Sequence, residues 1–325
     1  MCIRDRLCRI NPDVVHIQHE YFLYGGLITA VLFPVLVALS KLVSSKVIVT
    51  IHGVIPLRLL EDPEFRIENG IHGPALILKL GLLLVTKLIV LFSNKVIVHE
   101  PFFKEYLVRD YKERPDKIVV IPHGVEDLKP LPKDEVKKRL GLEGKTVLLY
   151  FGYLTGYKGI KELLDVYKEI AKKIPNTTLI IAGGPHPRLT REKWYREWIY
   201  SIVKRALDIQ QEIRNNGKIV FTGYVPEDKI PLYFSVADVV VLPYKARIAA
   251  SGPETLAITF EKPIIVSDGL TVGKLRVNVL VNNIIDFTTS KYRIETILNE
   301  VKALKSRRIW TVSYTHLTLP TSDLV

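Results

Sequence analysis

Cysteine and methionine are nearly missing from this sequence. Only Cys2 and Cys8 occur among its 325 residues, together with a single methionine. Two cysteines supply neither a disulfide framework nor a cysteine zinc site, and such low usage is typical of proteins in a reducing compartment. The composition therefore predicts a cytoplasmic protein that is stabilised by its apolar core.

Two further features are missing. No turn of the form G-x-G-x-x-G is followed by an acidic residue about twenty positions later, which argues against a dinucleotide-dependent dehydrogenase. No basic block with interleaved aromatic residues occurs either, although the net charge is +12. Because charges of both signs are interspersed, we expect no nucleic-acid partner. The excess positive charge favours a smaller anion or an acidic surface, such as a nucleotide diphosphate or an anionic membrane.

Short β-branched runs separated by segments of helical length dominate what is present. Such apolar runs are typical of parallel strands in a sheet that is covered on both faces. With 48% hydrophobic residues, the chain is long enough for two domains of this α/β kind. The first series of runs comprises residues 14–18, 46–53, 95–100 and 117–124, and the second comprises residues 147–152, 178–184, 218–223, 239–244, 262–269 and 278–283.

Two longer apolar stretches, residues 27–43 and 75–92, lie between predicted strands. Pro34 and Lys41 interrupt the first, and Lys79 and Lys87 interrupt the second. Buried crossover helices are the favoured interpretation because the flanking strands require connections of this length. The lysines of the second stretch share one side of a helix, so a helix lying on an anionic bilayer is the alternative.

The stretch 147–160, VLLYFGYLTGYKGI, has the features of a phosphate-binding loop. An apolar run stops at Gly152, and Lys158 follows at the entrance of a predicted helix. A helix N-terminus offers unpaired N–H groups and a partial positive charge, and glycine lets a ligand approach the backbone. Lysine adds a full positive charge, so we expect Gly152 and Lys158 to hold a phosphate group.

A second helix is predicted to start at Ser251-Gly252-Pro253-Glu254. Ser251 as the N-cap and Glu254 three residues later form a capping box, with Pro253 in the first turn. The backbone N–H groups of Ser251 and Gly252 are also suited to face a phosphate. For Glu254, two roles stay open: a cap, or a contact to a sugar.

Three histidines, His19, His52 and His123, stand at or just after predicted strand ends. In the run VVHIQH, strand alternation places His16 and His19 on opposite faces, so they are not a natural metal pair. No third ligand with metal-site spacing lies nearby, and we expect no metal. Strand-end histidines beside glycines are instead candidates to contact a substrate.

In this order, these motifs resemble the nucleotide-sugar domain of the retaining glycosyltransferases of family 4. The resemblance implies the GT-B fold, in which two Rossmann-like parallel-sheet domains face a cleft. It also implies transfer of a hexosyl group from a UDP- or GDP-linked sugar to a glycan or lipid-linked acceptor, with no cofactor and no metal. The resemblance also implies a cytoplasmic location. Peripheral contact with the inner face of the cell membrane is a further expectation.

The resemblance also divides the chain. Residues 9–127 match an incomplete acceptor-side domain, residues 128–144 a linker, and residues 145–310 the nucleotide-sugar domain. Residues 1–8 and 311–325 continue no strand or helix pattern and resemble adapter-derived sequence.

Site roles follow from the resemblance position by position. Lys158 matches a lysine that holds the donor diphosphate, and His19 matches a histidine close to the reacting carbon of the donor, which makes it the catalytic candidate. His52 and His123 are candidates on the acceptor side. The remaining donor-binding candidates are Gly152, the turn Gly223-Tyr224-Val225, whose backbone matches a contact to the base, and Ser251, Gly252 and Glu254.

The sequence departs from the family pattern at charged positions. Relatives carry an arginine where this chain has Tyr153, and two glutamates where it has Ile248 and Leu256. A non-catalytic nucleotide-sugar-binding or scaffold protein of the same fold is therefore the main alternative. A sugar epimerase would share the fold as well.

Overall fold

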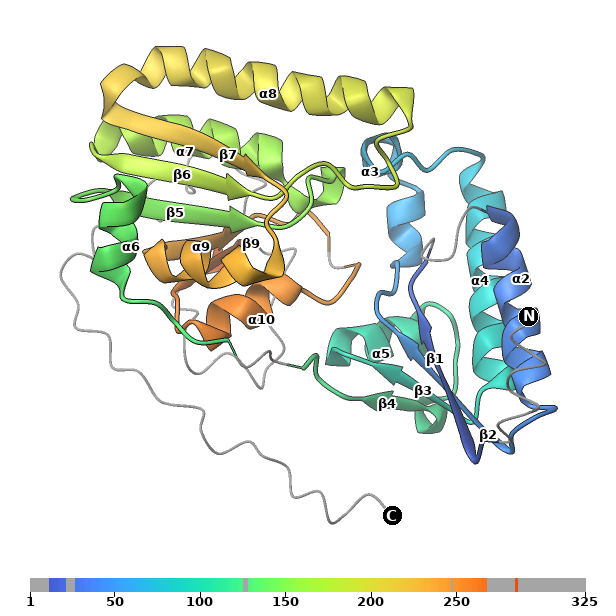
Figure 1. Cartoon of the computed structure of the whole chain (residues 1–325). Coiled ribbons are helices and arrows are strands. Elements are labelled where there is room, and N and C mark those ends of the chain that lie inside the picture. Colours follow the sequence, from blue (N-terminus) through green and yellow to red (C-terminus); the bar gives the residue numbers. More distant parts are fainter. Residues whose placement is uncertain (1–11, 22–26, 125–127, 247, 268–283, 286–325) are drawn as a thin grey trace.

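A computed structural model of the protein describes residues 12–21, 27–124, 128–246, 248–267 and 284–285. Within these residues the chain forms two α/β domains, each built on a parallel sheet (Figure 1). The prediction of two successive parallel-sheet domains is confirmed. The predicted strand at 278–283 lies outside the described residues.

The first domain has four strands in the order β1-β2-β3-β4. Each strand pairs in parallel with the next one along the chain, because a helix returns the chain to the starting edge of the sheet each time. The strands are β1 (Val14–His19), β2 (Lys46–Ile51), β3 (Lys95–Val98) and β4 (Ile118–Val120). The helices are α2 (Leu27–Ser40), α3 (Pro63–Glu68), α4 (Ala75–Phe92) and α5 (Pro101–Arg109), with 3-10 turns at η1 (Leu57–Leu60) and η2 (Pro115–Lys117).

The helices α2, α4 and α5 pack on one face of this sheet and close its core. Alternation along the strands sends every second side chain toward them. The core is aliphatic and aromatic, and its members include Phe33, Val37, Val47, Val49, Ile89, Val96, Val98, Phe103 and Leu107. The alternate residues of β1, which include His16 and Gln18, point to the opposite face and are exposed.

The second domain has six strands in the order β10-β9-β8-β5-β6-β7. The chain builds outward from β5 in one direction and then from β8 in the other, so the point between β5 and β8 is a topological switch. The strands are β5 (Thr146–Phe151), β6 (Thr177–Ala182), β7 (Gly217–Gly223), β8 (Val239–Leu242), β9 (Ile264–Ser267) and β10 (Ile284–Ile285). The helices are α6 (Lys133–Leu140), α7 (Ile160–Lys173), α8 (Lys193–Ile213), α9 (Ile230–Val236) and α10 (Gly252–Thr259), with 3-10 turns at η3 (Gly156–Lys158), η4 (Arg214–Asn216) and η5 (Glu227–Lys229).

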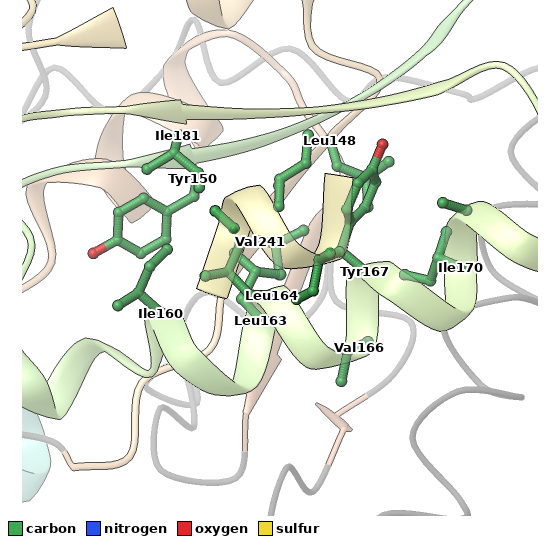
Figure 2. Close-up of a cluster of buried hydrophobic side chains, with 14 of the residues drawn as sticks. Leu148, Tyr150, Ile160, Leu163, Leu164, Val166, Tyr167, Ile170, Ile181 and Val241 are labelled. Atoms are coloured by element: carbon green, nitrogen blue, oxygen red, sulfur yellow. The ribbon is translucent and has the colours of Figure 1, made fainter. Parts of the chain in front are cut away.

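Two separate cores cover the two faces of this sheet. The helices α7 and α8 form one core, and α6, α9 and α10 contribute to the other. Figure 2 shows the first of these, where the apolar stripe of α7 meets alternate residues of the strands. Its members include Leu148, Tyr150, Ile160, Leu163, Leu164, Tyr167, Ile170, Ile181 and Val241.

The charged segment predicted as a linker contains the short helix α6. Val136 of α6 is buried in the second domain, and Lys133 and Lys137 both bind the carboxylate of Asp238, at 2.6 and 3.0 Å. Burial alone would raise the pKa of Asp238, but hydrogen bonds from Lys133, the Val147 N–H and Lys137 outweigh it and lower the pKa. These bonds fix α6 to the second domain.

The two longer apolar stretches form crossover helices α2 and α4, as expected. The further expectation that they are buried is wrong for α4, since only Thr86, Ile89 and Val90 of its eighteen residues are buried. By length and composition, α4 is apolar enough to cross a membrane, with a mean hydropathy of 2.4. Its buried side packs on the first sheet together with α2, as the core helix of a domain does.

The domains meet through α3 and through the segment before α10. A side chain at Gly156 would collide with the backbone of Glu68, so α3 lies directly on the loop that leads to Lys158. Lys245 of the second domain pairs with Glu68 and lies 3.6 Å from Glu64, both on α3. Burial opposes the charge on Lys245, but these carboxylates and Glu162 outweigh burial and raise its pKa.

Candidate functional site

The predicted donor residues converge at the switch point of the second sheet. Gly152 follows β5, and its N–H donates to the carbonyl of Ala182 at 2.9 Å, which extends the β5–β6 pairing by one residue. The backbone then turns with φ +123° at Gly152, a conformation that favours glycine. A Cβ built on Gly152 would lie 2.9 Å from Nζ of Lys158 and 3.6 Å from Cγ of Pro253. Because Gly152 has no side chain, its backbone, the ammonium group of Lys158 and the start of α10 lie close together.

The local backbone explains how Lys158 reaches this position. Residues Gly156–Lys158 form a single 3-10 turn, and Gly159 then adopts a left-handed conformation with φ +68° as the N-cap of α7. A side chain at Gly159 would collide with the carbonyl of Pro243, which follows β8. Only glycine fits here, and the loop is held against the end of β8.

The ammonium group of Lys158 is desolvated. Its Nζ lies 5.7 Å from the ring centre of Tyr244 and 6.0 Å from that of Tyr157. Burial lowers the pKa of Lys158 to about 8, while the charge of Glu20 from the first domain acts in the opposite direction. Among the described residues, no carboxylate is within ion-pair distance of Lys158. A half-buried cation in this situation favours an anionic ligand.

The start of α10 provides backbone donors beside Lys158. Ser251 is the N-cap, and its Oγ accepts from the N–H of Glu254 at 3.2 Å, which confirms the predicted cap. Ser251 and Glu254 are buried, and Leu256, in a position where relatives carry a glutamate, belongs to the apolar core. The helix N-terminus thus faces the same region as Lys158, as phosphate binding requires.

The turn after β7 lies beside this region and carries an exposed aromatic ring. Gly223 has φ +70°, and Tyr224 next to it is 64% exposed. A Cβ on Gly184, after β6, would lie 3.1 Å from the backbone nitrogen of Tyr224, so the two strand ends are closely packed. The side chain of Val225 is buried in the core and anchors the turn.

An aromatic row that the sequence analysis did not recognise crosses these strand ends. Tyr153, at the position of the family arginine, has its ring 5.2 Å from that of His186 and 6.4 Å from that of Tyr224. The planes of Tyr153 and Tyr224 differ by only 21°. The three residues follow β5, β6 and β7, so their common strand-end position was the available signal. Tyr153 and Tyr224 offer near-parallel aromatic faces suited to stacking rather than a second cation, and the ring of His186 meets Tyr153 at 62°.

His19 ends β1 on the covered face of the first sheet and is only 3% exposed. Its ring stacks on Phe33 at 4.2 Å and meets Tyr21 edge-on at 5.1 Å. Burial, with a smaller effect of His52, lowers the pKa of His19 to about 4, so the imidazole is neutral at pH 7. Within the described chain, neither ring nitrogen has a hydrogen-bond partner.

His52 and His123 lie together on the open face, joined by a third histidine. Nε2 of His99 is 3.0 Å from Nδ1 of His52, and the rings of His99 and His123 are 5.2 Å apart. Nδ1 of His99 donates to the carbonyl of Ile121 at 3.0 Å, which leaves its Nε2 to accept a hydrogen bond from Nδ1 of His52. Burial is the main cause that lowers the pKa of His52, with His123 and His16 adding to it.

The sequence analysis missed His99, although it follows β3 just as His52 follows β2. The backbone connects this group to the donor side, because the carbonyl of His52 accepts from the N–H of Ala250 at 3.0 Å, directly before Ser251. The backbone of His19 is hydrogen-bonded to the same segment, because its carbonyl accepts from the N–H of His52 at 2.9 Å. The structure therefore brings His52, His123 and the start of α10 to one region, whereas His19 reaches it only through its backbone and keeps its ring on the covered face. In the described part of the chain, no three His, Cys, Asp or Glu side chains are grouped as metal ligands.

Comparison with solved structures defines the class of the fold. The Anabaena HepE protein in complex with UDP and glucose superposes with a TM-score of 0.63 at 15% identity, covering 92% of this chain and 70% of that one. Sucrose-phosphate synthase from Thermosynechococcus elongatus gives a TM-score of 0.64 at 18% identity, covering 92% of this chain and 67% of that one. The two parallel-sheet domains thus have the GT-B fold.

Family models then place the sequence. Residues 2–127 match the model described as Glycosyltransferase Family 4, and residues 132–278 match the one described as Glycosyl transferases group 1. The chain belongs to these glycosyltransferases of the family 4 type.

Curated relatives are similar over part of their length. Lipopolysaccharide 1,2-N-acetylglucosaminetransferase of Salmonella typhimurium is 29% identical over 160 residues, which are 48% of this chain and 39% of that protein. Mannosylfructose-phosphate synthase of Agrobacterium fabrum is 28% identical over 154 residues, 46% of this chain and 32% of that protein. A GDP-mannose-dependent phosphatidylinositol monomannoside mannosyltransferase of Mycolicibacterium smegmatis is 25% identical over 43% of this chain and 34% of its own length. The matched part is less than half of each relative.

Proposed function

We propose that the protein is a retaining, metal-independent glycosyltransferase. It moves a hexosyl group from a UDP- or GDP-linked sugar to a glycan or lipid-linked acceptor in the cytoplasm. Membership of the family and the donors and acceptors in the relatives' names support the reaction class. The observation that carries the proposal is the meeting of Gly152, Lys158 and the start of α10 at the switch point of the second sheet.

In this proposal, Lys158 and the N–H groups at Ser251 and Gly252 hold the leaving diphosphate. They stabilise the charge that develops on it, which is the part of the reaction that a metal would otherwise serve. The exposed ring of Tyr224 lies against the base, and the backbone at Gly223 fixes its position. The N–H of Glu254 donates to the N-cap Ser251, and the side chain of Glu254 is buried. A sugar hydroxyl is a suitable partner for its carboxylate.

His19 is assigned to the donor sugar. A neutral imidazole with two unfilled nitrogens is able to accept from one sugar hydroxyl and donate to another. The row of His52, His99 and His123 is assigned to the acceptor, because it lies beside Ala250 on the first-domain side of the donor segment. The imidazole nitrogens there are suited to orient an acceptor hydroxyl.

Thermal unfolding of the full chain with UDP, GDP, ADP and NAD tests donor binding. A ligand at a hundred times its Kd adds about 2.7 kcal/mol of stability, enough for a clear rise in Tm. We expect a rise with UDP or GDP and none with NAD, unaffected by a chelator. The rise should fall to about half or less in Lys158→Met and persist in Lys172→Met, which alters an exposed lysine on α7. Stabilisation by NAD alone would refute the proposal.

The second candidate is a non-catalytic nucleotide-sugar-binding protein of the same fold. Tyr153 and Leu256 favour it, because neither supplies the charge that relatives place at these positions. Release of nucleoside diphosphate from a bound sugar nucleotide, with and without glycan or lipid acceptors, separates the two. Donor binding without any release would support the second candidate, and release with a transferred sugar would support the first.

A further inference from the structure

The outer surfaces of α2 and α4 form one continuous apolar face on the first domain. The two helices lie side by side and contact each other (Figure 1). Neither contains an aspartate or glutamate. Their large exposed side chains are Val31, Leu32, Val35, Leu39 and, just after α2, Leu42, and on α4 Leu76, Ile77, Leu80, Leu84 and Leu91. These residues define the α2–α4 face.

The spacing of these residues makes the face a stripe rather than a scatter. At 100° per residue, the four positions on α2 and the five on α4 each fall within an arc of about 100°. A soluble domain rarely exposes so large a contiguous apolar surface without a partner. Lys87 projects from the same arc of α4 and is exposed, so a long side chain with a charged tip stands among the leucines. Such a lysine is suited to the boundary between an apolar phase and water.

A cationic pocket adjoins the end of this stripe. The pocket has a volume of about 260 Å³ and lies between the last turns of α4 and the segment that leads into β4. Lys87, Arg114 and Lys117 line it, together with Leu91 of the α2–α4 face and the carboxylate of Glu113. Nζ of Lys117 donates to the carbonyls of Val90, Leu91 and Ser93, at 2.8, 3.2 and 3.0 Å. Lys117 therefore holds the end of α4 in place and adds its charge to the pocket, while Lys87 and Arg114 are the cations that can donate to an anion.

Positive charge is crowded around the pocket. Burial, and then the charges of Lys41 and Arg114, lower the pKa of Lys117 against the opposing effect of Glu113 and Asp116. Arg114 itself pairs with Asp116 at 2.9 Å, and the cations still outnumber these two carboxylates. Burial raises the pKa of Glu113 against the opposing effect of Lys87 and Lys117. Lys46 and Lys95 begin the neighbouring strands β2 and β3 at the same edge of the sheet. An anion placed in the pocket would relieve this repulsion.

We propose that the α2–α4 face docks on an anionic membrane, with its apolar stripe at the acyl boundary and a lipid phosphate in the pocket lined by Lys87, Arg114 and Lys117. The leucines supply apolar burial and the cations supply attraction to the headgroups, the combination that interfacial helices use. A second copy is a poorer occupant, since its own α2–α4 face has no carboxylate on either helix to pair with Lys87. The face lies on the side of the first domain away from the second domain, so docking leaves the Lys158 region free (Figure 1).

Vesicle flotation with the full chain tests the proposal. Vesicles of phosphatidylcholine alone are compared with vesicles in which phosphatidylglycerol replaces a third of it. We expect binding to the anionic vesicles only, and weakening by salt. The double variant Lys87→Gln/Arg114→Gln should bind about 30-fold more weakly, because each cation near the surface contributes roughly a factor of five. The double variant Leu80→Asn/Leu84→Asn should bind about a hundredfold or more weakly, because two leucines lose their burial.

Matched controls lie on α8, outside this face. Leu207 is as exposed as Leu91, and Lys193 is exposed as Lys87 is, so Leu207→Asn and Lys193→Gln should bind as wild type does. Unchanged unfolding temperatures show that all variants are folded, and an unchanged response to UDP or GDP separates this test from that of donor binding. If the Lys87→Gln/Arg114→Gln and Leu80→Asn/Leu84→Asn variants bind the anionic vesicles as tightly as wild type does, the proposal is overturned. So would a wild-type dimer that the leucine variant dissociates and that does not bind vesicles.

Discussion

The lowered pKa of Lys158 predicts that binding of a nucleoside diphosphate weakens above pH 8. The group has a pKa of about 8 because burial disfavours its charged form. Its protonated fraction then falls from about nine tenths at pH 7 to about one tenth at pH 9. If the bound diphosphate keeps Lys158 charged, the apparent Kd rises about tenfold over this interval. The phosphate groups do not add to the change, because their second pKa is about 6.

Replacement of Lys158 by methionine gives the magnitude of the charge contribution. A hydrogen bond to a charged group contributes about 1.5–3 kcal/mol, so Lys158→Met should weaken binding roughly 10- to 150-fold at pH 7. The variant should also lose the pH dependence between pH 7 and 9. Isothermal titration with UDP and GDP measures both effects, and Lys172→Met is the control. A Kd in Lys158→Met equal to that of wild type, or a pH profile that persists in the variant, would refute the assignment of Lys158.

The same substitution should stabilise the unliganded protein. Because folding lowers the pKa of Lys158, the charged form is disfavoured in the folded state. This cost is fully present below pH 8 and declines as the pH rises toward 10.5, the ordinary lysine value. Methionine removes the buried charge, and we expect a gain on the order of 2 kcal/mol at pH 7. Weaker ligand binding combined with a higher Tm distinguishes a functional lysine from one that merely supports the fold.

Three other predictions concern the loop, the base and the buried histidine. Gly159→Ala should cost about 2–4 kcal/mol in urea unfolding, whereas Gly144→Ala, with the same φ of +68° but open space around it, should cost only about 1 kcal/mol; equal costs would show that the loop does not pack as described. Tyr224→Ala should weaken UDP or GDP binding by about 1–3 kcal/mol through lost stacking, and Tyr200→Ala, equally exposed on α8, should have no effect. Folding lowers the pKa of His19 from 6.5 to about 4, so between these pH values the unfolded state binds more protons than the folded state. The free energy of unfolding of wild type should therefore fall by about 3 kcal/mol relative to that of His19→Phe as the pH falls from 6.5 to 4. Parallel curves of stability against pH for the two proteins would contradict the burial of His19.

Much of the fold could be predicted from local patterns. The β-branched runs and the helix-length segments between them indicate parallel strands. The second sheet is covered on both faces, as such runs predict, but in the described residues helices cover only one face of the first sheet, and that part of the prediction is wrong. The strand-ending Gly152, the lysine at the helix entrance and the cap at Ser251 are local features as well, and the structure contains all three. Backbone conformation at these positions depends on neighbouring residues, which the sequence displays directly.

The exposure of α4 could not be predicted in the same way. The sequence shows an apolar stretch of the length of a crossover helix, and hydrophobicity alone does not tell a buried helix from one that presents leucines outward. The packing of α4 on one sheet, with α2 as its neighbour, leaves the outer arc uncovered. The pocket beside it depends on Arg114 and Lys117 returning to the end of α4 from a different element.

Some features of the candidate site could be predicted from the sequence, and others are visible only in the structure. By itself the sequence determined which strand ends carry glycine, lysine and histidine, and hence the prediction of a phosphate site in a two-domain α/β protein. Only the tertiary structure decided that His99 joins His52 to His123, that Tyr153 and Tyr224 share a row, and that His19 is buried away from them on the other face. The physical reason is that parallel strands bring their carboxyl ends to one edge, while the register between strands and the contact between domains arise from packing among residues distant in sequence.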